Sequence, residues 1–366
     1  MATTEIPFLL GAAFKNQTVR GTATTMATIG AGAGGAGAIN NATDGAVQGD
    51  PGAGAGGSGI SFALAKSYTD KAVQTGSFSR DFANFIARTV STFQFVMPLK
   101  GNGGTAAGTP VSANFTPDLG IIALLRAAGF LGGASGAFWR YTPLATNLAT
   151  AAVYNGNTAA ANGLRAIIRD LESTGVTFDF TPGEVGTATF DLAGVLDSVD
   201  EGGTWGASPF AYGNQATLSA PPVRSAAFTW GPGTPDVRAV GFSQLSIAID
   251  NQAEDVPSSN SASGIIKRQT GREVRVTGIL DAAAAEILYE LNQLAEPSIA
   301  NAKPLTFTIG TAAIGGAICN AYRFTLPTPE LISLEKVDPL GASEAWSFEM
   351  VARSSTANGE IQLDFL

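Results

Sequence analysis

Alternating apolar and polar residues recur along the chain, and this period of two is typical of strands that bury one face. The clearest stretch is Val176-Thr177-Phe178-Asp179-Phe180-Thr181. A similar stretch at 361–365 follows an Asn358-Gly359 turn, which is a strong hairpin signal. The pattern predicts strands at residues 89–99, 176–181, 188–192, 245–249, 274–276, 305–309 and 361–365. We therefore expect a mainly β protein with α-helix added, an α+β fold class.

Two segments instead show the spacing of an amphipathic helix that covers one face of a sheet. The first begins with Thr116 as N-cap and Pro117 in the first turn, and it ends before Gly129. The second begins at Asp281 and ends before Pro297. No other segment predicts a helix as clearly.

The order of the predicted elements occurs twice. The first half has a strand near 14–29, a Gly-rich loop at 30–59, the strand at 89–99, a helix and strands at about 149–198. The second half has a strand near 237–249, a polar loop at 250–264, a strand at 265–280, a helix and further strands. This order predicts two tandem folds at 1–205 and 222–366, joined by a Gly-, Ser- and Pro-rich linker at 206–221.

The composition argues against the common forms of catalysis and against nucleic-acid binding. The chain has no histidine, which removes Ser-His-Asp and Cys-His nucleophile systems and most zinc sites. Its only cysteine, Cys319, allows no intrachain disulfide and is interpreted as a small buried residue of a strand. A net charge of −9 gives no basis for holding phosphates, and a charged fraction of only 14% suits a subunit whose surface is covered in an assembly.

Several motifs have a possible chemical meaning, but a simpler one is favoured for each. Two GxGxxG matches, at 30–35 and 52–57, are not followed by a helix and are attributed to chance. Asp170 and Glu172 could form a glycosidase pair, and acidic residues at 197–201 could bind calcium, but solvated charge is the preferred interpretation of both. We predict no enzyme activity, no cofactor, and no catalytic or metal site.

An ordered series of segments resembles a known family. The run FVMPLKGNGG at 95–104 is followed by LLRAAGF at 124–130, YTP at 141–143, and FTPGE at 180–184 leading into TFDLAG at 189–194. The second half adds 245–250, a Ser/Asn-rich loop, 271–277, a helix and a final strand pair. This series is similar to the major tail tube proteins of long, non-contractile bacteriophage tails. The resemblance covers roughly residues 88–366, and the Gly-rich tract at 30–59 has no counterpart in it.

The resemblance implies that each tandem fold consists of two packed antiparallel sheets with one flanking helix. Family members form six-fold rings that stack into a tube, so a duplicated chain implies trimeric rings and a single fold implies hexamers. The implied partners are further copies of the chain, the tail terminator, tape measure and baseplate proteins, and DNA that passes through the lumen without specific binding. The implied location is the virion tail, after synthesis in the host cytoplasm. The alternatives are a capsid-decorating or baseplate protein, and an extracellular carbohydrate-binding or adhesive β-protein.

The polar loop at 250–264 is the predicted ring-stacking element, because it is much longer than a hairpin requires. Such a loop could extend along the tube axis and become ordered on the next ring. Basic residues just beyond it could pair with its acidic residues in the adjoining ring. The predicted stacking residues are Asp250, Asn251, Glu254, Asp255, Ser258, Asn260, Lys267, Arg268 and Arg272.

Overall fold

Strands form most of the chain that the structure describes. The computed structural model describes residues 10–17, 45–49, 59–73, 81–101, 124–135, 138–143, 149–155, 164–201, 220–224, 228–230, 238–257, 265–281, 304–311, 320–337, 345–354 and 359–365. Within these residues the only helical segment is a single turn at 124–127. The prediction of a mainly β protein is confirmed.

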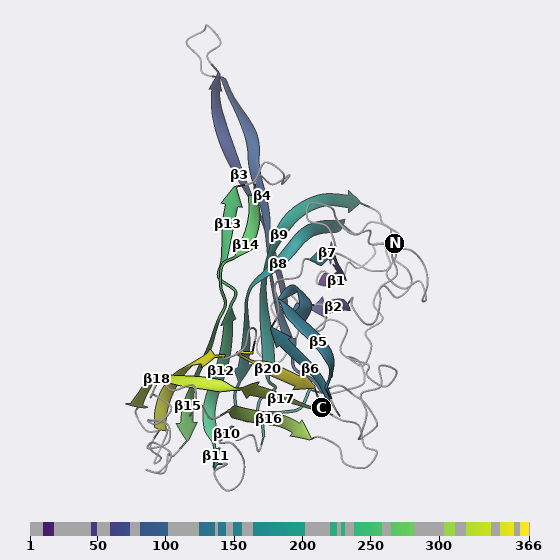
Figure 1. The fold of residues 1–366 in the computed structure, drawn as a ribbon. Coiled ribbons are helices and arrows are strands. Elements are labelled where there is room, and N and C mark those ends of the chain that lie inside the picture. The colour runs from purple at the N-terminus through teal and green to yellow at the C-terminus, as the bar shows by residue number, and fades with distance from the viewer. Residues whose placement is uncertain are drawn as a thin grey trace, which may run out of the picture.

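A large antiparallel sheet of 11 strands forms the upright body of the molecule (Figure 1). Its strands are β1 (Leu10–Asn16), β2 (Gly45–Gly49), β3 (Gly59–Val73), β4 (Asp81–Pro98), β7 (Ala149–Asn155), β8 (Leu164–Phe180), β9 (Thr187–Glu201), β12 (Phe242–Asp250), β15 (Glu273–Asp281), β18 (Thr328–Val337) and β19 (Ala345–Arg353).

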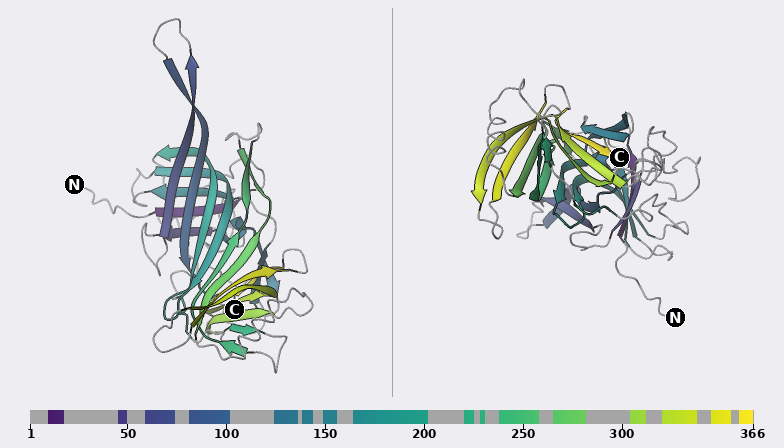
Figure 2. Two further views of the ribbon diagram at one scale, coloured as in Figure 1. Left: turned by 90° about the vertical axis from the view of Figure 1, so that its left-hand side faces the viewer. Right: turned by 90° about the horizontal axis from the view of Figure 1, so that it is seen from below.

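The large sheet branches at β8. One edge of β8 pairs with β9 along most of its length, and β9 pairs in turn with β4 and β4 with β3. The opposite edge of β8 pairs with β7 near its start and with β12 near its end. The path from β12 continues through β15 and β19 to β18. Figure 2 shows the first half of β8 and the second half of β9 bending away to join β7, β1 and β2 in a layer that crosses β3 and β4.

A second antiparallel sheet of seven strands packs against the lower part of the large sheet (Figure 1). In spatial order its strands are β11 (Arg238–Val240), β10 (Phe228–Trp230), β16 (Leu305–Thr311), β17 (Asn320–Leu326), β20 (Gln362–Phe365), β6 (Phe138–Pro143) and β5 (Phe130–Ser135). The remaining pair, β13 (Ala253–Pro257) and β14 (Ile265–Gln269), forms a separate two-stranded ribbon.

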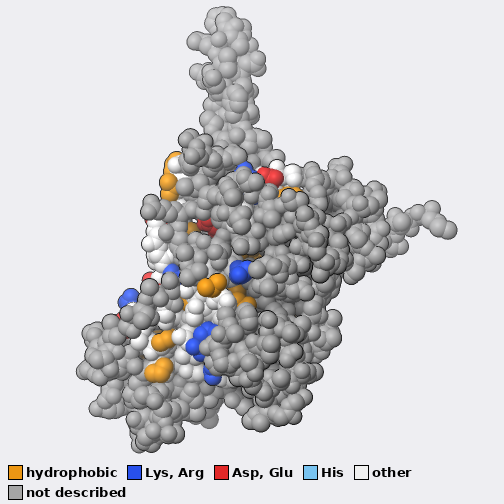
Figure 3. Space-filling model, turned by 45° about the vertical axis from the view of Figure 1, so that its right-hand side comes forward, with side chains coloured by type: hydrophobic (Ala, Val, Ile, Leu, Met, Phe, Trp, Pro, Cys, Tyr) orange, Lys and Arg blue, Asp and Glu red, His pale blue; other side chains and the backbone are white. Residues whose placement is uncertain are grey.

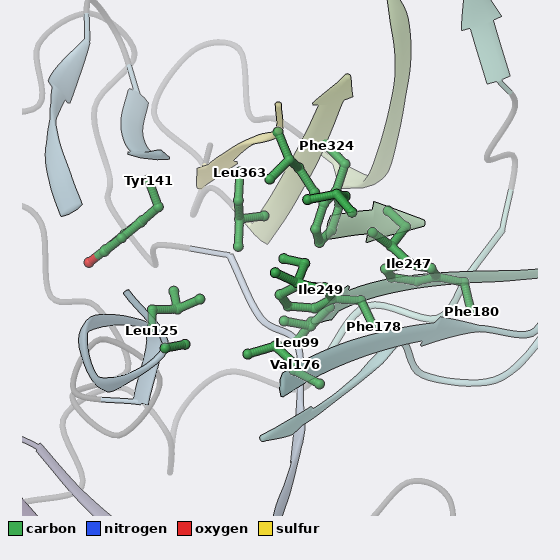
Figure 4. Close-up of a cluster of buried hydrophobic side chains, with 14 of the residues drawn as sticks. Leu99, Leu125, Tyr141, Val176, Phe178, Phe180, Ile247, Ile249, Phe324 and Leu363 are labelled. Atoms are coloured by element: carbon green, nitrogen blue, oxygen red, sulfur yellow. The ribbon is translucent and has the colours of Figure 1, made fainter. Parts of the chain in front are cut away.

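The core lies between the two sheets and consists largely of aromatic and branched side chains. Phe178 and Phe180 of the large sheet meet Phe324 of the second sheet, with ring centroids 4.9 and 5.5 Å from that of Phe324 (Figure 4). Leu125 of the helical turn points toward Tyr141 at one end of the cluster (Figure 4). All five side chains are at least 98% buried. Truncation of one such phenylalanine to alanine would cost about 3–5 kcal/mol.

The alternation read from the sequence matches the observed burial. In β4, Phe93, Phe95 and Met97 are buried while Thr92 and Gln94 are exposed. The predicted strands at 176–181, 188–192, 245–249, 274–276, 305–309 and 361–365 all fall on observed strands. Of the region expected to contain a strand at 14–29, only residues up to 17 are described, and β1 ends at Asn16.

The first predicted helix is described only at its C-terminal end. Residues 124–127 are helical, and Gly129 has a positive φ of 84°, the left-handed conformation that commonly ends a helix. The beginning of this helix, the Gly-rich tract at 30–59 except its two strand segments, Cys319, and most of the predicted linker at 206–221 lie outside the described residues. The second predicted helix also lies outside them, apart from Asp281, which is the last residue of β15.

Each sheet contains strands from both predicted halves of the chain. β8 and β12 join the halves in the large sheet, and β20 lies between β17 and β6 in the second sheet. The domain boundary at 206–221 stays a prediction. Among the described residues, no helix is long and apolar enough to cross a membrane.

Candidate functional site

The face of the large sheet that points away from the core is covered with small polar side chains. Gln94 of β4 donates a hydrogen bond of 3.0 Å to Asp191 of β9, and Ser246 of β12 donates one of 2.6 Å to Asp179 of β8. Arg275 of β15 bridges Glu273 of its own strand and Glu349 of β19. These contacts lie on six neighbouring strands, from β4 to β19. We call this surface the polar face.

The polar face is acidic. Strand register places its members opposite one another, for example Thr277 against Glu349 and Ser333 against Glu349. Among the described strand residues that alternation and register place on this face, acidic side chains outnumber basic ones: Asp179, Asp191, Asp250, Glu273, Glu330, Glu335 and Glu349 stand against Arg275 and Arg353. On the side of the molecule drawn in Figure 3, the coloured charged side chains lie in small separate groups. Because acidic side chains predominate on it, the polar face repels phosphates rather than holding them.

The polar face lies on a series of paired strands in the order β3-β4-β9-β8-β12-β15-β19-β18, and β3 and β18 are the two ends of this path. β3 has β4 as its strand partner, and β18 has β19. In the described part of the chain, the opposite edge of each strand has no strand partner. Such edges expose backbone donors and acceptors and are templates for pairing with another chain.

The strand pairings of this path repeat. The order β3-β4-β9-β8 is followed, through the contact of β8 with β12, by β12-β15-β19-β18. The sequence ISFAL at 60–64 of β3 corresponds to LSIAI at 245–249 of β12, and TFDLA at 189–193 of β9 corresponds to SFEMV at 347–351 of β19. The pairing with the next strand is also equivalent in the two halves. Phe62 of β3 lies opposite Phe93 of β4, and Ile247 of β12 lies opposite Val276 of β15.

A β-bulge occurs at the same place in both halves. In β8 the register against β9 shifts between Ser173, opposite Leu192, and Gly175, opposite Asp191. In β18 the register against β19 shifts between Leu331, opposite Met350, and Ser333, opposite Glu349. The aligned segments TFDLA and SFEMV place Asp191 with Glu349 and Leu192 with Met350, so the two bulges coincide. Bulges are specific features of a fold, and their coincidence argues for related units.

Two hairpins project from the same end of the large sheet (Figures 1 and 2). The longer is the distal part of β3 and β4, and the shorter is the ribbon of β13 and β14, which continues beyond β12 and β15. The sequence predicted a polar loop at 250–264 and one strand through 265–280. The structure corrects this, because residues 253–257 form β13, and the second strand is interrupted at 270–272.

The predicted stacking residues fall into three groups. Glu254 and Asp255 lie opposite Arg268 and Lys267 in the backbone register of the ribbon, so acidic and basic positions are paired within one chain. The backbone geometry therefore supplies an intrachain alternative to the pairing expected between rings. Ser258 and Asn260 lie outside the described residues. The stacking role of the ribbon stays a prediction.

The third group, Asp250, Asn251 and Arg272, lies at the base of the ribbon, next to the ends of β13 and β14. Asn251 is fully buried, and its amide donates hydrogen bonds to the carbonyls of Ala128 at 3.3 Å and Ser173 at 3.4 Å. Asp250 accepts a hydrogen bond from the backbone of Gln252, and Arg272 forms an ion pair of 3.6 Å with Glu360. Burial lowers the pKa of Arg272, although Glu360 partly opposes this. These residues anchor the ribbon to the body.

Asp170 and Glu172 are buried, which corrects their interpretation as solvated charge. Their exposed fractions are 8% and 2%. Asp170 accepts an ion-pair contact of 3.2 Å from Arg169, and Gln17 contacts both its carboxylate and its backbone amide. Arg169 also contacts Asp197 at 2.8 Å. Asp197 belongs to β9, so the expected acidic loop at 197–201 is the end of a strand.

The contacts of Asp170 and Arg169 connect Gln17, β8 and β9. Asp170 has a positive φ of 51° at a register shift of β8 against β9, a conformation that aspartate tolerates better than most residues. Its carboxylate is engaged by Gln17 and Arg169. Within the described residues, no group of three or more His, Cys, Asp or Glu side chains is placed to hold a metal ion.

The sequence interpretation missed Asp364, which links the two halves of the second sheet. Its fully buried carboxylate accepts two hydrogen bonds from Arg140 of β6, at 2.7 and 3.0 Å, and contacts Arg323 of β17 at 2.7 Å. The hydrogen bond to Asp364 raises the pKa of Arg140, although burial opposes this. The two arginines occupy similar segments, WRYT at 139–142 and YRFT at 322–325. This similarity was the available sequence signal.

The chain matches no protein-family profile, and it matches no curated protein sequence.

Proposed function

We propose that this protein is a non-catalytic structural subunit of a bacteriophage tail tube. Three chains would close into a ring, and rings would stack into a tube whose lumen conducts DNA. The observation that carries the proposal is that the strand order β3-β4-β9-β8 is followed, in one continuous sheet, by β12-β15-β19-β18 with the same pattern of pairing. The tail-tube resemblance of the sequence agrees with this arrangement.

The proposal includes two tandem folds within one chain. The aligned segments of β3 with β12 and of β9 with β19, and the coincident bulges in β8 and β18, support an internal duplication. Two units per chain and three chains per ring give six units around the lumen. The second sheet departs from a simple repeat, because the C-terminal strand β20 is inserted between β17 and β6.

In the proposed ring, the polar face lines the lumen and the core lies outside it. Support comes from the composition of the face, in which small polar and acidic side chains outnumber the basic ones, Arg275 and Arg353. A wall that carries few cations releases few counterions from DNA, so it does not retain the genome by that mechanism. The virion tail is the corresponding location.

Negative-stain electron microscopy of the purified full-length chain tests this function. We expect rings with a central hole and tubes made by their stacking. Rotational averaging should show six similar lobes, and mass measurement should give three chains per ring. Particles without a central channel would favour a capsid-decorating or adhesive protein, and a monomer at all concentrations would exclude the tube.

A further inference from the structure

The pairing of β8 with β12, which joins the two repeated strand series inside one chain, suggests how two chains can pair with each other. Within the chain, the end of β8 pairs antiparallel with β12: Phe178 lies opposite Ile247, Thr177 opposite Ala248 and Val176 opposite Ile249. This contact joins the last strand of the first unit, in spatial order, to the first strand of the second unit. It continues both the backbone ladder and the polar face.

The two strand edges that meet in this contact, those of β8 and β12, have equivalents at the two ends of the path, β18 and β3. β18 corresponds to β8, because each pairs with the strand bearing the TFDLA or SFEMV segment and each carries the same bulge. β3 corresponds to β12, because each pairs with the following long strand and carries the ISFAL or LSIAI segment. Strand direction also agrees, since three antiparallel steps separate β3 from β8 and three separate β12 from β18.

We propose that β18 of one copy pairs antiparallel with β3 of the next copy, in the register that β8 and β12 use within the chain. The partner is therefore a second copy of this protein. The proposal names the contact that closes the ring, and it rests on the assembly described under the proposed function. A chain whose two free edges match an edge contact already present inside it can add copies in one direction until the sheet closes.

The correspondence fixes the register. Gly175, Val176 and Thr177 of β8 correspond to Ser333, Leu334 and Glu335 of β18, because the bulges coincide. Ala248 and Ile249 of β12 correspond to Ala63 and Leu64 of β3. Transferring the observed pairs predicts Glu335 opposite Ala63 and Leu334 opposite Leu64 of the next copy. Leu64 and Leu334 are the equivalents of Ile249 and Val176, which are buried in the core.

The pairing also explains a feature of β18. Val176 of β8 is almost completely buried, whereas its equivalent Leu334 is only partly buried in the single chain. Ile332, the bulged residue equivalent to Thr174, is 51% exposed. A neighbouring strand on this edge would cover apolar surface at the position where β12 covers β8.

Disulfide cross-linking tests the register directly. The test variant carries Ala63→Cys and Glu335→Cys in a background in which Cys319 is replaced by serine. The matched control carries Thr177→Cys and Ala248→Cys, which face each other within one chain. An off-register control carries Ser61→Cys and Glu335→Cys, two residues away along β3. Each is oxidised after assembly, and products are separated by denaturing electrophoresis without reductant.

We expect the test variant to give reductant-sensitive dimers and trimers, and at least ten-fold less product from the off-register control. The Thr177/Ala248 control should lose its free thiols without forming species larger than one chain. Rings that form but do not cross-link through Ala63 and Glu335, or that cross-link equally out of register, overturn the proposed pairing while leaving the tube function intact. A ladder reaching six copies would support the edges but overturn the three-chain ring.

Hydrogen exchange of the wild-type chain provides a second measurement that needs no substitution. Assembled rings should protect backbone amides at both 61–65 and 333–337 compared with the unassembled chain. Protection at only one of these segments would contradict pairing between them. A wild-type chain that forms neither rings nor tubes would overturn both this pairing and the proposed function.

Discussion

Asp364 illustrates how a single side chain can join segments far apart in the sequence. Its carboxylate is fully buried and is held by arginines that come from β6 and β17, one from each half of the chain. Breaking a buried ion pair leaves groups without their charged partner and costs more than losing an exposed pair. Asn251 has a similar role at the base of the ribbon, where its amide satisfies two backbone carbonyls.

Asp364→Asn should therefore destabilise the protein by about 3 kcal/mol, because both arginines would lose their counter-charge. The matched control is Glu330→Gln, which removes a 2.8 Å ion pair with Arg353, a side chain that is 60% exposed. That change should cost about 0–1 kcal/mol. Urea unfolding of both variants below the assembly concentration measures the difference. Equal losses of stability would contradict the structural role of Asp364.

Tyr322 presents the opposite situation, because its buried hydroxyl has no hydrogen-bond partner among the residues that the structure describes. Its ring is fully buried beside Phe180 and Phe324, and burial raises the pKa of its phenol. Tyr322→Phe keeps the ring and removes the unpaired group, so it should leave stability unchanged or raise it by about 1 kcal/mol. A loss of 2 kcal/mol in thermal unfolding at pH 7 would show that the hydroxyl has a stabilising partner.

The same variant has a predicted pH dependence. The phenol pKa is raised in the folded state above the ordinary value of 10.0, so the unfolded chain loses this proton first as pH rises. The associated stability is fully present below about pH 10 and is lost as pH rises above that value. Tyr322→Phe lacks this contribution, so its unfolding free energy should fall less steeply than that of the wild type between pH 9 and 11. Parallel curves would contradict the raised pKa.

At the scale of elements, the two projecting hairpins are the parts least involved in the core. The ribbon of β13 and β14 is joined to the body through Asn251 and through hydrogen bonds between Thr270 and Gln252. Thr270 donates from both its backbone and its hydroxyl to the carbonyl of Gln252. The ribbon can therefore be shortened above this point without removing buried contacts of the described residues.

Replacement of residues 253–269 by Gly-Ser-Gly should leave a folded, ring-forming protein that does not extend tubes. The physical reason is that the core and both sheet edges stay intact while the proposed stacking element is lost. Tube length in electron micrographs and thermal stability measure the two effects separately. As a control, Asn251→Ala retains the ribbon but removes its anchor, and it should lower stability by about 1–3 kcal/mol. Tubes of normal length from the shortened chain would show that the ribbon is dispensable.

At the scale of the whole molecule, the polar face is the feature most closely related to the proposed passage of DNA. Its acids lie on adjacent strands, with Asp179 on β8 and Asp191 on β9. Ring closure through β18 and β3 would bring the same face of every copy to the inside. The charge of this face, rather than the net charge of the chain, then determines whether DNA moves freely.

Asp179→Lys combined with Asp191→Lys should make assembled tubes retain duplex DNA, whereas wild-type tubes should not. Retention should weaken steeply between 50 and 200 mM salt, because bound phosphates release counterions. Sedimentation of tubes with labelled DNA gives the measurement. Glu184→Lys, in the exposed turn after β8, is a control away from the face and should have little effect. Strong DNA retention by wild-type tubes would exclude a non-adhesive acidic lumen.

The sequence by itself determined the local structure where one face of a strand is buried. The alternation around Phe93 and Phe178 specifies a strand because side chains in extended backbone point to opposite faces in turn. Gly129 marked the end of the first helix for an equally local reason, since its φ of 84° favours a residue without a Cβ. Such signals need only neighbouring residues.

Only the tertiary structure decided which strands pair, which carboxylates are buried and where β20 is inserted. Asp170 and Asp364 are ordinary acidic residues in the sequence, and their burial depends on Gln17, Arg169, Arg140 and Arg323, which include residues more than 150 positions away. The polar ribbon at 253–257 shows no apolar alternation, because it contributes no face to the core and is held by backbone pairing with β14. Pairing between distant strands depends on three-dimensional closure of the sheet, and no local pattern encodes it.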